Sequence, residues 1–161
     1  MHWHIEQFCN GRCLAHPWSP EYTQFVAFYR EVLMGRKWQP FRTELSMFHC
    51  GLHVAGQADL LCVDEKGGVV IVDWKRSKRI TRHGWKHMKA PLAHLPDANY
   101  YHYALQLNLY RYILETEYGM KVSMMCLGVF HPTQASYAVV DIGCMDAEIQ
   151  KIVQHVKHVQ S

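Results

Sequence analysis

The sequence predicts an α/β fold in which a central mixed β-sheet is flanked by helices. The first observation is the order of the patterns: two helical, three strand, one long helical, two strand and a last helical pattern. The second is the run Val69-Val70-Ile71-Val72, whose apolar character on both faces predicts a central, covered strand. The third is composition: 161 residues, 49% of them hydrophobic, can bury a core and exclude a disordered chain. We expect a single domain over residues 1–161.

Helix signals open the chain. A short helix should end at Gly11, because glycine adopts the left-handed backbone that follows many helices. Ser19 is the candidate cap of a second, amphipathic helix, which should end at Gly35. The two helices cover residues 2–10 and 21–34, with a turn at Pro17 and Pro20 between them.

Three strands are predicted next, over residues 43–49, 53–63 and 69–75. The second and third are joined by the segment Asp64-Glu65-Lys66-Gly67-Gly68. This is a hairpin signal, since two glycines can supply the positive φ with which the chain reverses. The two strands should therefore pair in antiparallel fashion.

Residues 76–97 have no clear periodicity and contain Pro91 and Pro96, so we expect a long, basic, partly ordered insertion there. A strong helical pattern follows and should be capped by Asp97 or Asn99. The remaining elements are that helix over residues 100–118, ended by Gly119, strands over 122–130 and 136–142, and a helix from its cap Asp146 to about residue 159.

No apolar stretch reaches the length that spans a bilayer, and no signal peptide precedes the first helical pattern. We therefore expect a soluble, intracellular protein of the cytoplasm or nucleus, with no membrane partner. The six cysteines form no CxxC pair, which favours reduced thiols. His83 and His87 have the helical spacing of a zinc pair but no acidic or cysteine partner close by, so a zinc module stays the less favoured alternative.

Two carboxylates are expected to meet at the predicted hairpin. Asp59 lies five residues before its turn and Asp73 five residues after it, so antiparallel pairing places them near each other. Two such carboxylates repel unless a cation lies between them, and hard oxygen ligands suit Mg²⁺ or Mn²⁺.

Lys75 should reach the same place. Asp73 and Lys75 are two residues apart, so their side chains leave one face of the strand, and the ammonium points at whatever the metal holds. A phosphodiester fits, since the metal polarises a phosphoryl oxygen and the lysine stabilises developing charge. The alternative is a surface Asp and Lys on an edge strand. It is weakened because Asp73 ends a buried apolar run, where a charge needs a partner.

Four sequence motifs carry a family resemblance. The segments Gly56-Gln57-Ala58-Asp59, Asp73-Trp74-Lys75 and Gln106-Leu107-Asn108-Leu109-Tyr110 resemble the GxxD, DxK and Q-x-x-x-Y motifs of the RecB-type, lambda-exonuclease-like branch of the PD-(D/E)xK nuclease superfamily. The opening His2-Trp3-His4-Ile5-Glu6 resembles that branch's first motif, with His2 as its histidine and His4 as the alternative. The likeness is closest to enzymes of large DNA viruses and protists, which makes a viral origin one alternative.

The resemblance implies a restriction-endonuclease-like core and a metal-dependent hydrolase of DNA phosphodiester bonds. It implies an exonuclease or end-processing enzyme of repair, recombination or replication. It also implies metal ligation by His2, Asp59, Asp73 and the carbonyl of Trp74, with Mg²⁺ or Mn²⁺ as the cofactor. Catalytic roles fall to Lys75, Asp73, Asp59 and Glu44, with Gln106 and Tyr110 lining the site from the long helix.

The basic insertion is expected to contact the backbone of single- or double-stranded DNA, because Lys and Arg bind phosphates by releasing counterions. Trp85 is a candidate for stacking on a base. The alternative is a solvated loop whose charges only aid solubility. The candidate nucleic-acid-binding residues are Arg76, Lys78, Arg79, Arg82, Trp85 and Lys86.

Two further readings concern the domain as a whole. A catalytically inactive nucleic-acid-binding domain of the same fold would need a broken site, and no core motif residue is missing from the sequence. An iron–sulfur cluster, which some relatives hold with one early and three late cysteines, is not expected because Cys144 stands alone near the end.

Overall fold

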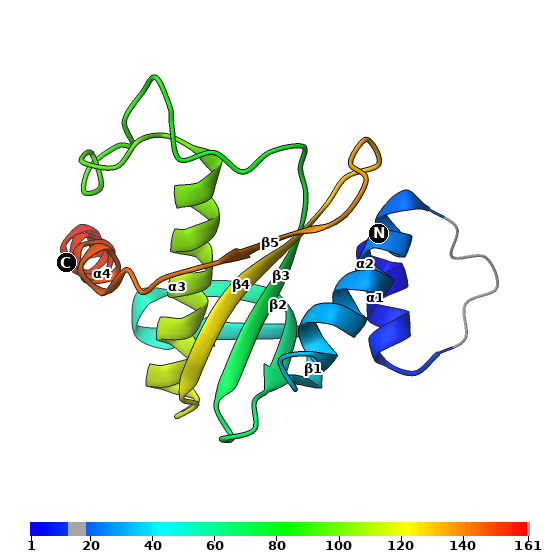
Figure 1. Cartoon of the computed structure of the whole chain (residues 1–161). Helices are drawn as coiled ribbons and strands as arrows, with labels where there is room; N and C mark the ends of the chain where they lie inside the picture. Colours follow the sequence, from blue (N-terminus) through cyan, green and yellow to red (C-terminus); the bar gives the residue numbers. More distant parts are fainter. Residues whose placement is uncertain (13–18, 161) are drawn as a thin grey trace.

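The computed structural model of the chain describes residues 1–12 and 19–160 (Figure 1). Pro17 of the predicted turn lies outside the described residues. In chain order, the elements are α1 (His2–Cys9), α2 (Pro20–Phe28), the π-helix η1 (Tyr29–Met34), β1 (Gln39–His49), the 3₁₀ turn η2 (Cys50–Leu52), β2 (Val54–Val63), β3 (Val69–Arg76), α3 (Asn99–Glu117), β4 (Val122–Phe130), β5 (Ala138–Asp141) and α4 (Asp146–Gln160).

The five strands form one sheet in the order β1-β2-β3-β4-β5. Strands β3 and β4 run parallel, and every other neighbouring pair is antiparallel, so the sheet is mixed as predicted. The long helix α3 makes the crossover between the two parallel strands, which parallel pairing requires. Strand β3, with its apolar run, lies at the centre of the sheet and is buried along most of its length.

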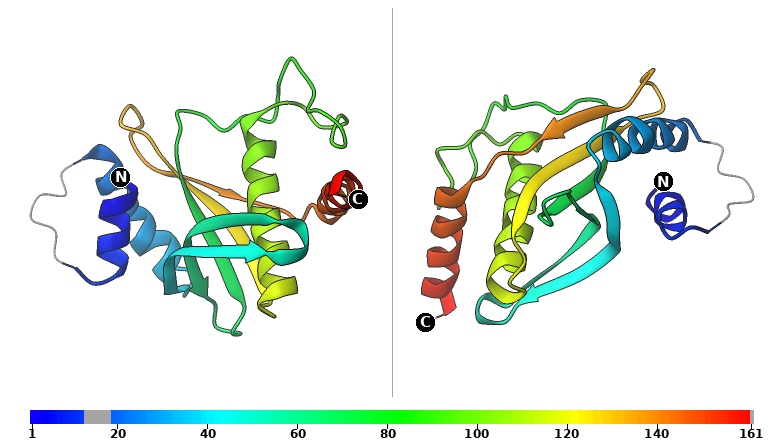
Figure 2. Two further views of the ribbon diagram at one scale, coloured as in Figure 1. Left: turned by 180° about the vertical axis from the view of Figure 1, so that it is seen from behind. Right: turned by 60° about the horizontal axis from the view of Figure 1, so that its bottom comes forward.

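Helices cover both faces of the sheet (Figures 1 and 2). On one face, α1 and α2 pack on a core that includes Phe25, Val70 and Trp74. On the other, α3 packs on a core that includes Ile71 and Leu107. Side chains along β3 thus alternate between the two cores, as the period of two in a strand demands. The same alternation directs Asp73 and Lys75 to the face that α3 covers.

The cap of the second helix agrees with its sequence signal, since Ser19 Oγ accepts the Tyr22 backbone N–H at 3.1 Å. The predicted caps of α3 do not. Its N-cap is Ala98, with no side-chain cap. Asn99 instead accepts the Thr81 N–H and donates to the Arg79 carbonyl, and Asp97 pairs with His102. Both polar side chains are thus used to hold the preceding loop or the helix surface.

The hairpin between β2 and β3 forms where it was predicted, but only one of its glycines has a positive φ. Gly67 has φ +78°. Gly68 is needed for space instead, because a Cβ there would lie 2.7 Å from the Ser123 Cβ. Strand β1 begins earlier than predicted, at Gln39, and β5 is shorter, because only Ala138–Asp141 pair with β4.

The segment of residues 77–98 between β3 and α3 has more local structure than the expected partly ordered insertion. Leu92 and Leu95 are buried, and Ile80 packs beside the core under α3. The Met88 N–H donates to the Leu95 carbonyl at 2.9 Å. The apolar residues of this basic segment therefore anchor it to the fold, and its charged residues are left on the outside.

Candidate active site

The central strands part at the two predicted carboxylates. The ladder between β2 and β3 ends with the pair Leu60–Val72, one residue short of Asp59 and Asp73. Beyond this point β3 continues beside β4. The Trp74 backbone N–H lies beyond the last backbone pair with β2. It donates to the side chain of Asp59, with 2.7 Å between the nitrogen and Oδ2. The end of the ladder thus leaves room for side chains, and Asp59 fixes the backbone of the Asp73-Trp74-Lys75 segment.

Asp73 is the buried acid of the site. The residue is 2% exposed, and Lys75 Nζ lies 2.7 Å from its Oδ2. No group among the described residues makes a hydrogen bond of good geometry to that oxygen. Burial, helped by the Asp59 carboxylate, raises the pKa of Asp73 to about 6. A buried carboxylate beside a second one is a site that favours a further positive charge.

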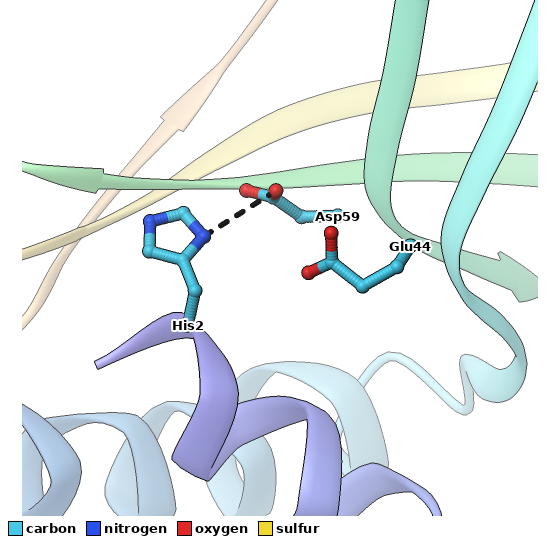
Figure 3. Close-up of side chains that lie close together, drawn as sticks. All are labelled: His2, Glu44 and Asp59. Atoms are coloured by element: carbon cyan, nitrogen blue, oxygen red, sulfur yellow. Dashed lines mark ion pairs between the residues drawn. The ribbon is translucent and has the colours of Figure 1, made fainter.

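Three residues from separate elements form a cluster with metal-ligand spacing (Figure 3). Ligand atoms of His2, Glu44 and Asp59 all lie within 4.8 Å of one another, the only such group in residues 1–12 and 19–160. His2 Nδ1 lies 3.4 Å from Asp59 Oδ1, and this contact raises the pKa of His2. Desolvation, with Asp59 beside it, raises the pKa of Glu44. Two carboxylates that repel each other, with an imidazole beside them, form a ligand set that suits a divalent cation.

Glu44 reaches this cluster from an unusual backbone. It has φ +48° within β1, between the paired residues Thr43 and Leu45. A left-handed residue inside a strand is uncommon outside glycine and is often found at functional sites. The cluster takes its histidine from His2. The ring of His4 packs edge-on against Trp3 and Tyr22. The geometry therefore favours His2 over His4 as the candidate ligand.

Lys75 is held from three directions. Besides Asp73, its Nζ donates to Gln106 Oε1 at 3.0 Å and lies 4.7 Å from the ring centroid of Tyr103. Gln106 Nε2 in turn donates to the Tyr110 hydroxyl at 2.7 Å, which orients the amide. A charge held this way has few ways to rotate, so the ammonium is fixed toward the carboxylates.

The glycine of the GxxD segment has a steric explanation. A Cβ on Gly56 would lie 2.4 Å from Tyr110 Cε1, so any larger residue would displace the tyrosine ring. Tyr110 is buried against the sheet and also binds Gln106. The absence of a side chain at residue 56 thus allows α3 to approach β2 and bring Gln106 to Lys75.

Trp74 contributes to the site through its backbone. Its indole is 2% exposed and packs against Phe25 and Phe28 on the opposite face of the sheet. That packing fixes the strand between the two charged residues. Metal ligation by its carbonyl stays a prediction.

The candidate nucleic-acid-binding residues lie along the loop that leaves β3. Arg76 differs from the rest, because its Nε donates to the buried Glu21 Oε1 at 2.7 Å, and this ion pair lowers the pKa of Glu21. All six residues are exposed, Arg76 included: Arg76, Lys78, Arg79, Arg82, Trp85 and Lys86. His83 and His87 gain no third ligand among the described residues, so nothing there supports a zinc module.

Two residues outside the sequence motifs contact the predicted site residues: Tyr103 contacts Lys75, and Glu21 contacts Arg76. Tyr103 stands one helical turn before Gln106, so helical spacing from a recognised motif residue could have found it. Glu21 gave no such signal, because its partner Arg76 lies in a different element and their contact depends on the packing of α2 against the end of β3.

The fold and the site together define a class of protein. A mixed five-stranded sheet with helices on both faces, its central strands parting at two carboxylates and a lysine, is an α/β restriction-endonuclease-like core. Residues 24–161 match a protein family described as a PDDEXK-like domain of unknown function (DUF3799). The chain belongs to this family.

One solved structure shares the fold at low sequence identity. A protein from Eubacterium rectale that is presumed to be an exonuclease has 12% identity to this chain and a TM-score of 0.55. The comparison covers 97% of this chain but 62% of that protein, so the chain spans less than two thirds of its relative. A repair endonuclease from Pyrococcus abyssi gives a TM-score of 0.40 at 19% identity, over 71% of this chain and 40% of that one. None of the curated proteins matches this sequence.

No helix in the described ranges, 1–12 and 19–160, is both long and apolar enough to cross a membrane.

Proposed function

We propose that this chain is a metal-dependent nuclease that hydrolyses phosphodiester bonds of DNA. The observation that carries the proposal is the convergence of Asp59, Asp73 and Lys75 beside His2 and Glu44. Carboxylates and a neutral imidazole would hold Mg²⁺ or Mn²⁺, with the Trp74 carbonyl as a further ligand. When bound, the metal supplies Lewis-acid polarisation of the phosphate and a more acidic water.

The residues of the chain divide the remaining work. Lys75 donates hydrogen bonds to the attacking water or to a non-bridging phosphate oxygen, where negative charge grows in the transition state. Asp73, Gln106 and Tyr103 hold its ammonium in place before substrate arrives, so little reorganisation is needed. Asp59 keeps the Trp74 backbone fixed through the bond to its N–H.

The basic loop after β3 supports DNA as the substrate. Its exposed Lys and Arg side chains begin directly after Lys75, so phosphates of a bound strand would meet them next to the scissile bond. An exonuclease or end-processing role in repair, recombination or replication is the finer proposal, as is membership in the RecB-type, lambda-exonuclease-like branch. It rests on the order of the four motifs.

The test is digestion of labelled DNA in the presence and absence of Mg²⁺ or Mn²⁺, for the native chain and Lys75→Ala. Loss of a preorganised charge at the reacting phosphate should lower the rate about 100- to 1,000-fold. Lys66→Ala is the matched control, since Lys66 is exposed in the hairpin at the far end of β3. Its rate should stay at the native level.

A catalytically inactive nucleic-acid-binding domain is the competing function. It predicts that the native chain binds DNA but releases no product with either metal, whatever residue stands at 75. Metal-dependent cleavage that Lys75→Ala removes would exclude it. Equal cleavage by the native chain and Lys75→Ala would contradict the assignment of Lys75.

A further inference from the structure

Two tyrosines continue the site along α3, away from Gln106. Tyr103 and Tyr100 lie one helical turn apart, so they share a side of the helix near its start. Each has a cation over its ring. Lys75 Nζ lies 4.7 Å from the Tyr103 centroid, and the Arg82 guanidinium carbon lies 4.1 Å from the Tyr100 centroid. A row of two tyrosine rings, each with a cation over it, therefore leads from the lysine of the site to the basic loop.

The basic loop is fixed beside this row by hydrogen bonds to its backbone. Asn99, at the start of α3, accepts the Thr81 N–H at 2.8 Å and donates to the Arg79 carbonyl at 2.9 Å. The Asp97 N–H donates to the Lys86 carbonyl at 2.7 Å. The loop leaves β3 and lies above the start of α3 in Figure 1. The backbone that carries Arg82 is thus fixed next to Tyr100 on both sides, and the guanidinium lies over the ring.

Trp85 follows Arg82 by three residues on the same loop, and nothing covers its side chain. Its relative exposure is 105%, the highest of the exposed large apolar residues in the described parts of the chain. The backbone just before it is packed tightly, because a Cβ on Gly84 would lie 2.3 Å from the Asp97 carbonyl oxygen. A full indole held in water on a fixed backbone loses the hydrophobic free energy that burial would provide. Rings next to cations on a loop of this kind are typical of surfaces that bind unpaired bases.

We propose that a single-stranded segment of nucleic acid lies along this row, with one base stacked on Trp85. The row comprises Lys75, Tyr103, Tyr100, Arg82 and Trp85. Arg82 and its exposed neighbours would contact phosphates, and the strand would lead to Lys75, which rests on the proposed nuclease function. The strand must be unpaired at Trp85, because stacking needs an open face of a base, and inside a duplex the neighbouring bases cover both faces.

The choice of Trp85 as the stacking ring follows from what lies on the other rings. One face of Tyr100 carries Arg82, and one face of Tyr103 carries Lys75. Both tyrosines are also half-buried. Only Trp85 in this row offers a whole ring, so the tyrosines position the cations while the tryptophan receives the base.

The test measures binding without cleavage. A fluorescein-labelled oligonucleotide and its blunt duplex are titrated with protein in EDTA, and anisotropy gives Kd for each. Trp85→Ala should raise Kd for the single strand about 5- to 150-fold, the equivalent of one lost base–aromatic stack, and should change the duplex Kd much less. Trp85→Phe should recover most of the single-strand affinity.

Phe48→Ala is the matched control. Phe48 is also an exposed aromatic, 56% accessible, but it lies by Tyr118 at the other end of α3. Its single-strand Kd should equal that of the native chain. Three results would overturn the proposal: no binding of the single strand by the native chain, an unchanged Kd in Trp85→Ala, or equal losses for single strand and duplex.

The outcome is independent of the nuclease assay because no metal is present. Trp85-dependent binding of the single strand would support the row even if Mg²⁺ and Mn²⁺ yielded no cleavage. Normal cleavage together with a Kd that Trp85→Ala leaves unchanged would remove this inference and leave the proposed function standing.

Discussion

At the scale of single residues, the site depends on how one lysine is held. Lys75 has a carboxylate, an amide and an aromatic face as partners, contributed by β3 and α3. Asp73 and Gln106 belong to recognisable motifs, whereas Tyr103 does not. The ring of Tyr103 offers its face to the ammonium without accepting a proton, so it can position Lys75 while leaving its charge free for substrate.

Tyr103 is therefore predicted to act as a positioning residue. Tyr103→Leu should lower kcat about 3- to 30-fold with little change in KM, because a cation–π contact contributes about 0.5–2 kcal/mol and the ammonium would lose its orientation. Tyr103→Phe keeps the ring face and should restore kcat to within about twofold. Rates with a saturating DNA substrate and Mg²⁺ check this.

Tyr118→Leu serves as the control, since Tyr118 caps the far end of α3 and should not affect kcat. A kcat that falls equally in Tyr103→Phe and Tyr103→Leu would show that the hydroxyl or the fold, and not the ring face, matters at this position.

The spacing of Asp59 and Asp73 in the sequence predicted that the two acids lie close together. Asp59 and Asp73 are equidistant from the hairpin, and the observed register of β2 and β3, extended by one residue, would place them opposite each other. What could not be predicted is the manner of their approach. The ladder stops one residue earlier, and a side-chain oxygen replaces the missing backbone acceptor for the Trp74 N–H. Such an exchange depends on how far two strands separate, which no local pattern specifies.

At the scale of elements, α1 and β1 were harder to interpret than α3. Helix α1 was predicted, yet only its packing beside β1 distinguishes His2 from His4. The position of Glu44 depends on a left-handed residue within a strand, and nothing in an alternating pattern signals it. The predicted N-caps of α3, Asp97 and Asn99, were wrong because both side chains bond elsewhere. Asn99 and Asp97 bond the loop and the helix surface instead, and the Tyr100 N–H at the helix start donates to the Thr81 carbonyl.

The contribution of the basic loop to DNA binding can be tested apart from catalysis. Replacing Arg79, Arg82 and Lys86 together by glutamine should weaken DNA binding and reduce the slope of log Kd against log salt by about two to three. The slope falls because a protein that makes fewer phosphate contacts releases fewer counterions when it binds. Melting curves should stay close to those of the native chain, since all three side chains are exposed.

Lys37, Lys66 and Lys121 provide the matched control for that triple variant. They are exposed cations of other turns, away from the loop after β3. Replacing them by glutamine should alter the salt slope far less. Equal slopes for the native chain and the loop variant would show that the loop charges only keep the protein in solution.

At the scale of the whole molecule, two cores on opposite faces of one sheet hold the site from both sides. Phe25 and Phe28 fix Trp74 from the α2 face, and α3 fixes Lys75 from the other. The site residues Asp73 and Lys75 thus lie on β3, the strand against which helices pack from both faces of the sheet. The sequence pattern predicted this architecture because strand β3 is apolar on both faces, and the order of the elements left one place for a crossover helix.

Asp73→Asn tests the central claim most directly, because it removes one negative charge at the centre of the site with almost no change in volume. The measurement is cleavage of end-labelled single- and double-stranded DNA with Mg²⁺ or Mn²⁺, beside a melting curve of each protein. We predict a folded variant whose metal-dependent rate is at least about 1,000-fold lower, equivalent to about 4 kcal/mol of lost transition-state stabilisation. Native-level, metal-dependent cleavage by a folded Asp73→Asn protein would contradict the account.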